Sequence, residues 1–348
     1  MPQRDLIVVG ASAGGVEALR TLVGSLPAEL PAAVLVVLHV PAQGASALAA
    51  VLARETALDV APAVDGEVLA PGTVRVAPPD RHLLVVDDEG VLRTHLSRGP
   101  RENGHRPAAD PLFRSAAHVA GARVVGVVLS GSLDDGAAGL RRVRGRGGLA
   151  VVQDPADAAY SGMPEAALHI AGADHVAPVG ELGDLLGSLV GLDVPAVPGA
   201  GDGGPRPLED ALAEMEGAAL ACADRPGAPT GISCPDCGGP LYGSAVGPMH
   251  RFRCRVGHAW SADTLVGAQT SAVESALWAA LRSLEEKADL ADRMSESAVS
   301  RGHLLTADRF TEHAGDARQA ALVLRDLLEG AALSVPRAGG DEGPSTGD

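Results

Sequence analysis

Three motifs place a serine, a histidine and an aspartate at the ends of apolar runs. Ser12 lies in GASAGG after LIVVG, His39 ends the run AVLVVLHV, and Asp135 follows VVGVVLSG. A serine hydroxyl attacks a carbonyl only when a base takes its proton, and a histidine oriented by an aspartate is such a base. The backbone N–H groups of Ala13 and Gly14 would begin a helix and could stabilise an oxyanion. These residue types fit nucleophilic hydrolysis of an ester or amide.

Each motif also has a more ordinary interpretation. A glycine-rich turn between strand and helix more often binds a nucleotide phosphate, a single histidine is more often structural, and an Asp-Gly pair is usually a turn or a helix cap. A dinucleotide site requires an acidic residue at the end of the second strand, where this chain has His39. That disfavours a nucleotide-binding oxidoreductase. The residues alone leave Asp134 and Asp135 as candidates for the third position.

The apolar runs alternate with helical patterns from residue 5 to about residue 190, which predicts an α/β fold with a doubly wound, mostly parallel sheet. Such sheets bind ligands beyond the C-terminal ends of their strands, which is where the three motifs lie. We expect strands at 6–10, 33–40, 73–78, 123–131, 148–153 and 175–179, and a hairpin over 82–96 that turns at 88–90. We expect helices at 14–26, 46–54, 111–120, 137–146, 164–171 and 181–190.

Cysteine and histidine spacing predicts a metal site. Cys234 and Cys237 form a Cys-x2-Cys pair, sixteen residues follow, and Cys254 and His258 form a Cys-x3-His pair. Three thiolates and an imidazole at this spacing suit a closed, tetrahedral and therefore structural Zn²⁺ site in a small zinc-ribbon-like module. Free thiols, or a redox role for Cys234 and Cys237, are the weaker alternatives.

Composition limits the classes of partner. The 348 residues carry a formal net charge of -16, which argues against a nucleic-acid or membrane-surface binder. Short arginine clusters at 141–146 and 251–255 are interpreted as a solvated helix face or the rim of the metal site. The N-terminus lacks the features of a signal peptide, and no apolar run is long enough to span a bilayer. We therefore expect a cytoplasmic protein that needs no membrane insertion.

The chain divides into five segments by composition. We expect a catalytic domain over 1–192, a Pro/Gly-rich linker over 193–207, a zinc-binding module over 208–262 beginning with a helix at 208–222, an α-helical hairpin over 263–332, and a disordered tail over 333–348. Apolar residues in the hairpin alternate at spacings of 3 and 4, which is typical of a coiled-coil seam. The expected seam positions are Val273, Leu277, Ala280, Leu284, Ala288, Ala291 and Met294, then Phe310, Ala314, Ala317, Ala321, Leu324 and Leu328. The break at 300–302 favours pairing within the chain over a helical protein partner.

Several segments resemble the CheB-type protein-glutamate methylesterases of bacterial chemotaxis. GASAGGVEAL, LHVP and LSGSLDDGAAGL resemble that family's three catalytic motifs, and further similar segments are 76–85, 105–117 and 151–168. The resemblance implies that Ser12, His39 and Asp135 form the triad, with Asp135 chosen over Asp134. It also places four residues in or near the substrate cleft: His82, His105, Arg114 and Met163.

The resemblance implies hydrolysis of glutamate γ-methyl esters on a methylated chemoreceptor or receptor-like protein, without a cofactor for the chemistry. Deamidation of glutamine by the same machinery is a second implied activity. The chain departs from the family at Gly131-Ser132-Leu133, where many members have Gly-Met-Gly, and we expect no N-terminal receiver domain to control it. The alternative is a non-enzymatic signalling scaffold that binds partners through the zinc module and helices.

Overall fold

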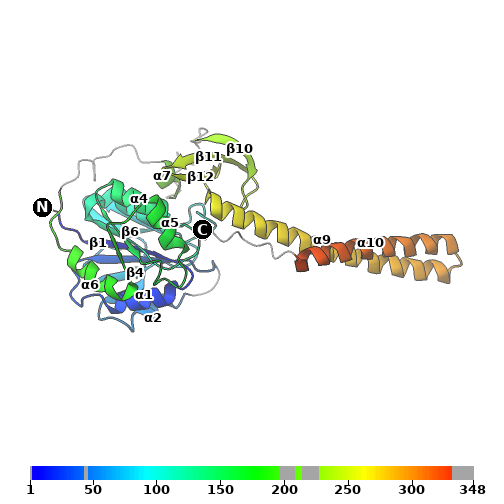
Figure 1. The fold of residues 1–348 in the computed structure, drawn as a ribbon, viewed down its shortest axis with the longest axis horizontal. Coiled ribbons are helices and arrows are strands. Elements are labelled where there is room, and N and C mark those ends of the chain that lie inside the picture. Colours follow the sequence, from blue (N-terminus) through cyan, green and yellow to red (C-terminus); the bar gives the residue numbers. More distant parts are fainter. Residues whose placement is uncertain (1, 43–45, 196–207, 214–226, 331–348) are drawn as a thin grey trace, which may run out of the picture. The chain divides into compact units, whose positions relative to one another are not determined.

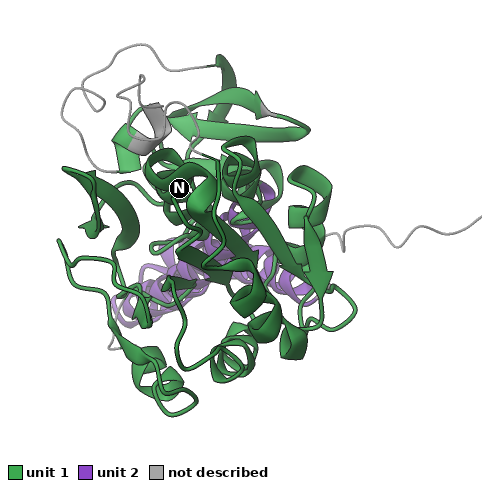
Figure 2. Cartoon of the chain, turned by 90° about the vertical axis from the view of Figure 1, so that its left-hand side faces the viewer, with its two compact units in different colours: residues 1–265 green, residues 266–348 purple. Residues whose placement is uncertain are grey.

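The chain folds into two compact units, residues 1–265 and 266–348 (Figures 1 and 2). The structure, a computed structural model, describes residues 2–42, 46–195, 208–213 and 227–330. Most of the predicted linker, the second half of the helix predicted at 208–222 and the tail predicted at 333–348 lie outside the described residues.

A seven-stranded sheet forms the centre of the first unit, and all its neighbouring strands are parallel. The strand order is β3-β4-β2-β1-β7-β8-β9, so β1 lies between β2 and β7. The predicted doubly wound α/β fold is therefore confirmed. The strands are β1 (Leu6–Ala11), β2 (Ala33–Leu38), β3 (Asp59–Pro62), β4 (Thr73–Val76), β7 (Val124–Val128), β8 (Leu149–Gln153) and β9 (His175–Ala177).

Helices cover both faces of this sheet (Figure 1). Alternate residues of β1 belong to two separate apolar clusters, with Ile7 and Val9 in one and Leu6 and Val8 in the other. The first cluster is closed by α1 (Gly15–Gly24), α2 (Leu48–Leu52) and α6 (Val179–Leu189). The second is closed by α3 (Ala109–Ala120), α4 (Ala137–Gly145) and α5 (Gly162–Ile170), and by the predicted hairpin of β5 (His82–Asp88) and β6 (Val91–Ser97). A short 3-10 turn (Gly121–Arg123) follows α3.

Strand β3 was not predicted from the sequence. Its four residues, Asp59 to Pro62, are exposed or half-buried and lie at the edge of the sheet. An edge strand pairs on one side only, so it tolerates a proline and needs no continuous apolar run. The pattern that identifies the buried central strands is therefore missing here.

The metal-ligand region forms a four-stranded antiparallel sheet that belongs to the same compact unit as the parallel sheet. Its strands are β10 (Ala228–Ser233), β11 (Pro240–Val246), β12 (Met249–Cys254) and β13 (Ala259–Ser261), and the short helix α7 (Leu208–Ala213) precedes them. We call residues 228–261 the metal-ligand module.

The second unit is the predicted helical hairpin, formed by α9 (Ala262–Ser300), which begins in the first unit, and α10 (Leu304–Gly330). The seam predicted for α10 is buried at Ala314, Ala317 and Ala321. In α9 the prediction was partly wrong, because Leu281 is buried in place of Ala280, and Val273 and Met294 are exposed. The larger Leu281 removes more apolar surface from water than an alanine would. Among the described helices, none combines the length and the apolar character needed to cross a membrane.

A glycine contact between α3 and α4 gives a test of the fold. A Cβ at Gly139 would lie 2.6 Å from the Cβ of Phe113 and 3.0 Å from the carbonyl oxygen of Asp110. We expect Gly139→Ala to lower the free energy of unfolding by roughly 1–3 kcal/mol, measured by urea denaturation. Gly145→Ala in the same helix, where a Cβ meets nothing within 4 Å, is the matched control and should not destabilise. Equal effects of the two substitutions would contradict this packing.

Candidate active site and metal centre

Ser12 lies in the tight connection between β1 and α1. Gly14 has a φ of 69°, and a Cβ there would come within 2.8 Å of Ser130 Oγ and 2.9 Å of Ala159 Cβ. Only glycine therefore fits the turn that places Ser12 at the start of α1. Among the described residues, no hydrogen bond uses the backbone N–H of Ala13 or Gly14. Both N–H groups remain available to an oxyanion beside Ser12.

His39 joins Ser12 to Asp135. It follows β2, which pairs with β1, and Asp135 follows β7 on the other side of β1. His39 Nδ1 lies 3.1 Å from Ser12 Oγ, and His39 Nε2 lies 2.7 Å from Asp135 Oδ2. An ionised carboxylate only accepts hydrogen bonds, so Nε2 carries the proton and Nδ1 of the neutral ring accepts the Ser12 hydroxyl. This is the geometry of a nucleophile with its base.

Asp135 is 2% exposed and is held as an anion by its donors. Burial by itself would raise the pKa of this carboxyl, but the hydrogen bond and charge of His39 and the Ala109 N–H outweigh it, so the pKa lies well below its usual range. The Ala109 N–H is 2.6 Å from Oδ2, and the Asp110 N–H is 3.2 Å from Oδ1. These N–H groups belong to the first residues of α3, where a helix favours negative charge.

Asp134, the other candidate, points away from His39. Its Oδ1 accepts a hydrogen bond of 2.8 Å from the hydroxyl of Ser261 in β13. Burial, together with the nearby Asp110 and Asp135, raises its pKa to about 7, although the Ser261 hydrogen bond acts in the opposite direction. The geometry therefore assigns Asp135 to His39 and Asp134 to the metal-ligand module.

A cleft of about 550 Å³ opens beside Ser12 and His39. His105 lies in it, with its ring stacked on that of His39 at a centroid separation of 3.8 Å and an interplanar angle of 9°. Burial and the neighbouring His39 lower the pKa of His105 to about 4, so His105 is neutral at pH 7. The remaining lining residues are Ala13, Val40, Pro41, Ala42, Arg101, Gly104 and Arg106.

Three of the four expected cleft residues are buried elsewhere. His82 is 0% exposed and its Nε2 is 3.0 Å from the carbonyl oxygen of Pro100, Arg114 forms two hydrogen bonds with the buried Glu102, and Met163 is 0% exposed beneath Gly131. None of the three lines the described cleft. The expectation that they contact substrate is therefore corrected, and His105 alone of the four lies at the opening.

Sequence reasoning did not single out Asn103. This residue is 2% exposed, and its Nδ2 donates a hydrogen bond of 3.1 Å to Asp135 Oδ1. It lies in the loop before α3, which no apolar periodicity marks. The only available signal was its position two residues before His105, at the edge of a segment that resembles the family.

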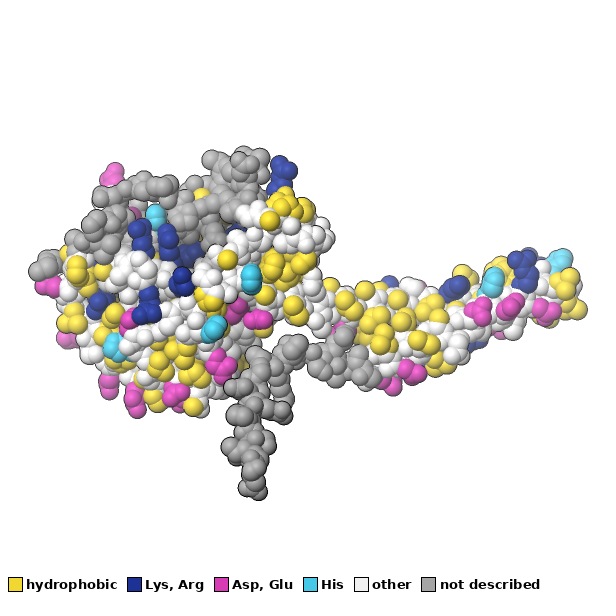
Figure 3. Space-filling model, turned by 45° about the horizontal axis from the view of Figure 1, so that its top comes forward, with side chains coloured by type: hydrophobic (Ala, Val, Ile, Leu, Met, Phe, Trp, Pro, Cys, Tyr) yellow, Lys and Arg dark blue, Asp and Glu magenta, His cyan; other side chains and the backbone are white. Residues whose placement is uncertain are grey.

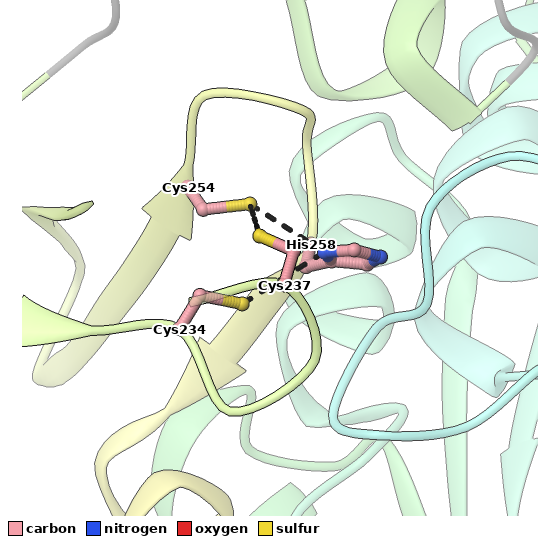
Figure 4. A group of neighbouring side chains, drawn as sticks. All are labelled: Cys234, Cys237, Cys254 and His258. Atoms are coloured by element: carbon pink, nitrogen blue, oxygen red, sulfur yellow. Dashed lines mark hydrogen bonds between the residues drawn. The ribbon is translucent and has the colours of Figure 1, made fainter. Parts of the chain in front are cut away.

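The predicted metal ligands lie together (Figure 4). One sulfur or ring nitrogen from each of Cys234, Cys237, Cys254 and His258 lies within 4.8 Å of the other three. Cys237 Sγ is 3.6 Å from Cys254 Sγ, and His258 Nδ1 is 3.8 Å from Cys234 Sγ and 3.5 Å from Cys254 Sγ. The fourth cysteine of the chain, Cys222, lies outside the described residues.

The two arginine clusters differ in environment. Arg141 and Arg144 are exposed on α4, and Figure 3 shows a group of Lys and Arg side chains on one face of the first unit. Arg251 and Arg253, in contrast, are 3% and 6% exposed, so they do not form a solvated face. They pair with Glu102, and Arg251 also pairs with Asp110, inside the protein.

The chain is similar to several known proteins. A family model described as CheB methylesterase matches residues 7–186. Protein-glutamate methylesterase/protein-glutamine glutaminase 2 of Xanthomonas oryzae is 41% identical over 184 residues, which cover 53% of this chain and 51% of that protein. The protein of the same name from Methanosarcina mazei is 39% identical over 191 residues, which cover 54% of this chain and 52% of that protein. The crystal structure of the Thermotoga maritima CheB methylesterase catalytic domain matches with a TM-score of 0.52 and 32% identity, covering 53% of this chain and 98% of that one. The chain spans about half the length of these curated relatives.

The raised pKa of Asp134 predicts a pH-dependent stability. Its pKa is about 7 when folded and ~3.9 when unfolded, so between these values only the unfolded chain releases the proton, and stability is lost as pH rises through this window. Asn at this position carries no charge. Relative to wild type, we expect Asp134→Asn to gain roughly 1–3 kcal/mol of stability between pH 5 and pH 8, measured by urea unfolding. The exposed Asp184→Asn is the control, and an unchanged difference at the two pH values would contradict the prediction.

Proposed function

Because the chain belongs to the CheB methylesterase family, we propose that it hydrolyses glutamate γ-methyl esters on a chemoreceptor or receptor-like protein in the cytoplasm. The observation that carries the proposal is the hydrogen-bonded series Ser12–His39–Asp135 at the C-terminal edge of a parallel sheet, open to a cleft. The non-enzymatic scaffold is disfavoured because a protein with no chemistry to perform has no need of this arrangement.

In the proposed reaction, Ser12 Oγ attacks the ester carbonyl while His39 Nδ1 accepts the hydroxyl proton. The oxyanion lies against the N–H groups of Ala13 and Gly14, and Asp135 stabilises the imidazolium that forms. His39 then returns the proton to the methoxide, so methanol leaves and an acyl-serine remains. Water attacks this acyl group with His39 again as base, which frees Ser12 and the glutamate carboxylate.

The same residues account for glutamine deamidation, which we propose as a second activity. A side-chain amide would be attacked at its carbonyl in the same way, and His39 would protonate the departing nitrogen so that ammonia leaves. Water then hydrolyses the same acyl-serine, so both reactions use only groups of the chain and water. Neither step requires a cofactor.

The cleft rim suits an acidic protein substrate. Arg101 and Arg106 line it, and Arg106 is also fixed by Asp80, whose Oδ1 is 3.0 Å from Arg106 Nε. Arg101 is half-exposed and has Asp236 Oδ1 at 3.7 Å. Cationic side chains beside Ser12 favour a substrate segment that carries carboxylates around the esterified glutamate. A methylated receptor segment that also carries free glutamates has this chemistry.

We also propose that Cys234, Cys237, Cys254 and His258 bind one structural Zn²⁺. Tetrahedral zinc with Zn–S bonds of about 2.3 Å and Zn–N bonds of about 2.0–2.1 Å brings its ligand atoms within about 3.8 Å for S···S and about 3.5 Å for S···N. The three separations given above, 3.5–3.8 Å, fit these values. The four residues leave no position for a substrate, so the ion would tie strands together and take no part in bond making.

Substitution of the nucleophile tests the proposed reaction. We expect Ser12→Ala to lower methanol release from a chemoreceptor carrying radiolabelled glutamate methyl esters by at least about a thousandfold, because no other group replaces its hydroxyl. His39→Ala and Asp135→Asn should also lose most of the rate, while Ser188→Ala on α6 should not. Near wild-type release by Ser12→Ala would rule out the proposed nucleophile.

Metal analysis tests the zinc proposal. We expect close to one equivalent of zinc in protein purified without chelator, and a large loss of zinc in Cys237→Ser, because a hydroxyl is a poor substitute for a thiolate ligand. Tyr242→Phe in the neighbouring β11 is the control and should retain the metal. Less than a few tenths of an equivalent in the wild-type protein would count against the site.

A further inference from the structure

The metal-ligand module packs directly on the loop that supports the proposed active site. Ala259 of β13 accepts a hydrogen bond of 2.7 Å from the Asn103 N–H, and its own N–H donates 3.1 Å to the carbonyl of Arg101. These bonds extend β13 by a short parallel bridge between Glu102 and Ala259. Residues 101–105, which we call the support loop, are therefore paired with the module as a strand would be.

Asn103 links the module to the proposed catalytic carboxylate. Its Nδ2 donates to Asp135 Oδ1 at 3.1 Å, while its Oδ1 accepts the backbone N–H of Ser261 at 3.2 Å. The amide can present its donor to Asp135 only in one orientation, and the Ser261 N–H selects that orientation. Asn103 has a φ of 53°, a left-handed conformation that asparagine and glycine accept more readily than other residues.

The support loop also places the histidine that stacks on His39. His105 Nδ1 donates 2.7 Å to the carbonyl oxygen of Asn103, and the stacked ring fixes one face of His39. Between them, Gly104 lies against Trp260 of β13, where a Cβ would come within 3.3 Å of the indole. Asp135 is thus held by Asn103, which the module contacts, and His39 is stacked on His105, which is hydrogen-bonded to Asn103.

A buried cluster of ion pairs also connects the module to the support loop and to α3. Arg251 of β12 bonds to Asp110 at 2.8 Å and to Glu102 at 3.2 Å, and Arg114 bonds to Glu102 at 2.7 and 3.0 Å. Arg253 lies 3.6 Å from Glu102. Removing one partner of such a buried cluster leaves a charge uncompensated, which is strongly destabilising. Separating the module from α3 would therefore expose these charged groups to water or leave them buried without partners.

Two of the four metal ligands adjoin these contacts in sequence. Cys254 follows Arg253 at the end of β12, and His258 precedes Ala259 at the start of β13. The turn between them is closed by the Cys254 N–H, which donates to the carbonyl of His258 at 3.0 Å. A metal bound by Cys254 and His258 would lock this turn, and with it the register of Ala259 and Ser261.

We propose that the metal-ligand module is a positioning element of the esterase centre: Ser261 and Ala259 hold Asn103 on Asp135 and His105 on His39, so that the rate of the chemical step depends on the metal site. The proposal rests on the esterase function proposed above. Asn103 is a positioning residue, since it acts through Asp135 and lies outside the cleft lining. Its loss should lower kcat and leave KM nearly unchanged, because the residues that line the cleft remain.

The first test removes the side chain of Asn103 and leaves the metal-ligand module unchanged. Asn103→Gly keeps a backbone that accepts the left-handed conformation, so the loop need not be strained. We expect kcat for methanol release from the methylated receptor to fall about tenfold or more, the range for a lost hydrogen bond to a charged group, with KM within about twofold. His250→Ala, an exposed position next to Arg251, is the matched control and should retain both constants. A wild-type kcat in Asn103→Gly would overturn the proposal.

The second test removes the metal from the full-length protein and follows amide hydrogen exchange as well as activity. Metal loss should raise exchange at least about tenfold in peptides covering 99–109, while α6 (179–189) stays protected, and kcat should fall in parallel. Unchanged exchange in 99–109 after complete metal loss, or an unchanged kcat with raised exchange, would overturn the proposal. If the wild-type protein releases no methanol, the esterase function fails, and the exchange measurement alone decides whether the module holds the support loop.

Discussion

The buried carboxylate of Asp135 is the group around which the proposed active site is organised. A charge with 2% exposure would be costly by several kcal/mol without compensation. Four donors compensate it: the N–H groups of Ala109 and Asp110, the Asn103 amide and His39 Nε2. The four donors come from three parts of the fold, namely the start of α3, the support loop and the end of β2. The chain must bring all three together before His39 has a defined proton position.

The parallel sheet explains why these parts meet. Because β1 lies between β2 and β7, the residues after their C-terminal ends share one edge of the sheet. The left-handed Gly14 then turns the chain so that Ser12 reaches this edge with the N–H groups of Ala13 and Gly14 beside it. The scaffold supplies position, whereas the donors around Asp135 supply the electrostatics that the proposed role of His39 as a base requires.

The sequence predicted those parts of the site that follow strand ends, and it missed those that depend on contacts distant in the chain. Ser12 and His39 could be predicted because a strand-end position is visible in the apolar pattern. Asn103 could not be predicted, because its orientation depends on Ser261, which lies 158 residues away in the chain. The ion pair of Arg251 could not be predicted either, because its partner Glu102 lies 149 residues earlier. His82, Arg114 and Met163 were placed near the cleft by segment resemblance, which gives no information on which side of a segment faces it.

We infer that Asp135 fixes His39 as the Nε2–H tautomer, leaving Nδ1 as the base for Ser12. Long-range ¹H–¹⁵N NMR of the histidine rings tests it directly, with the His39 signals assigned by their loss in His39→Gln. At a pH where the ring is neutral, we expect a protonated Nε2 and an unprotonated Nδ1 for His39, and a loss of this preference in Asp135→Asn. A neutral His39 with its proton on Nδ1 would rule out this arrangement, because its Nδ1 could not accept the proton of Ser12.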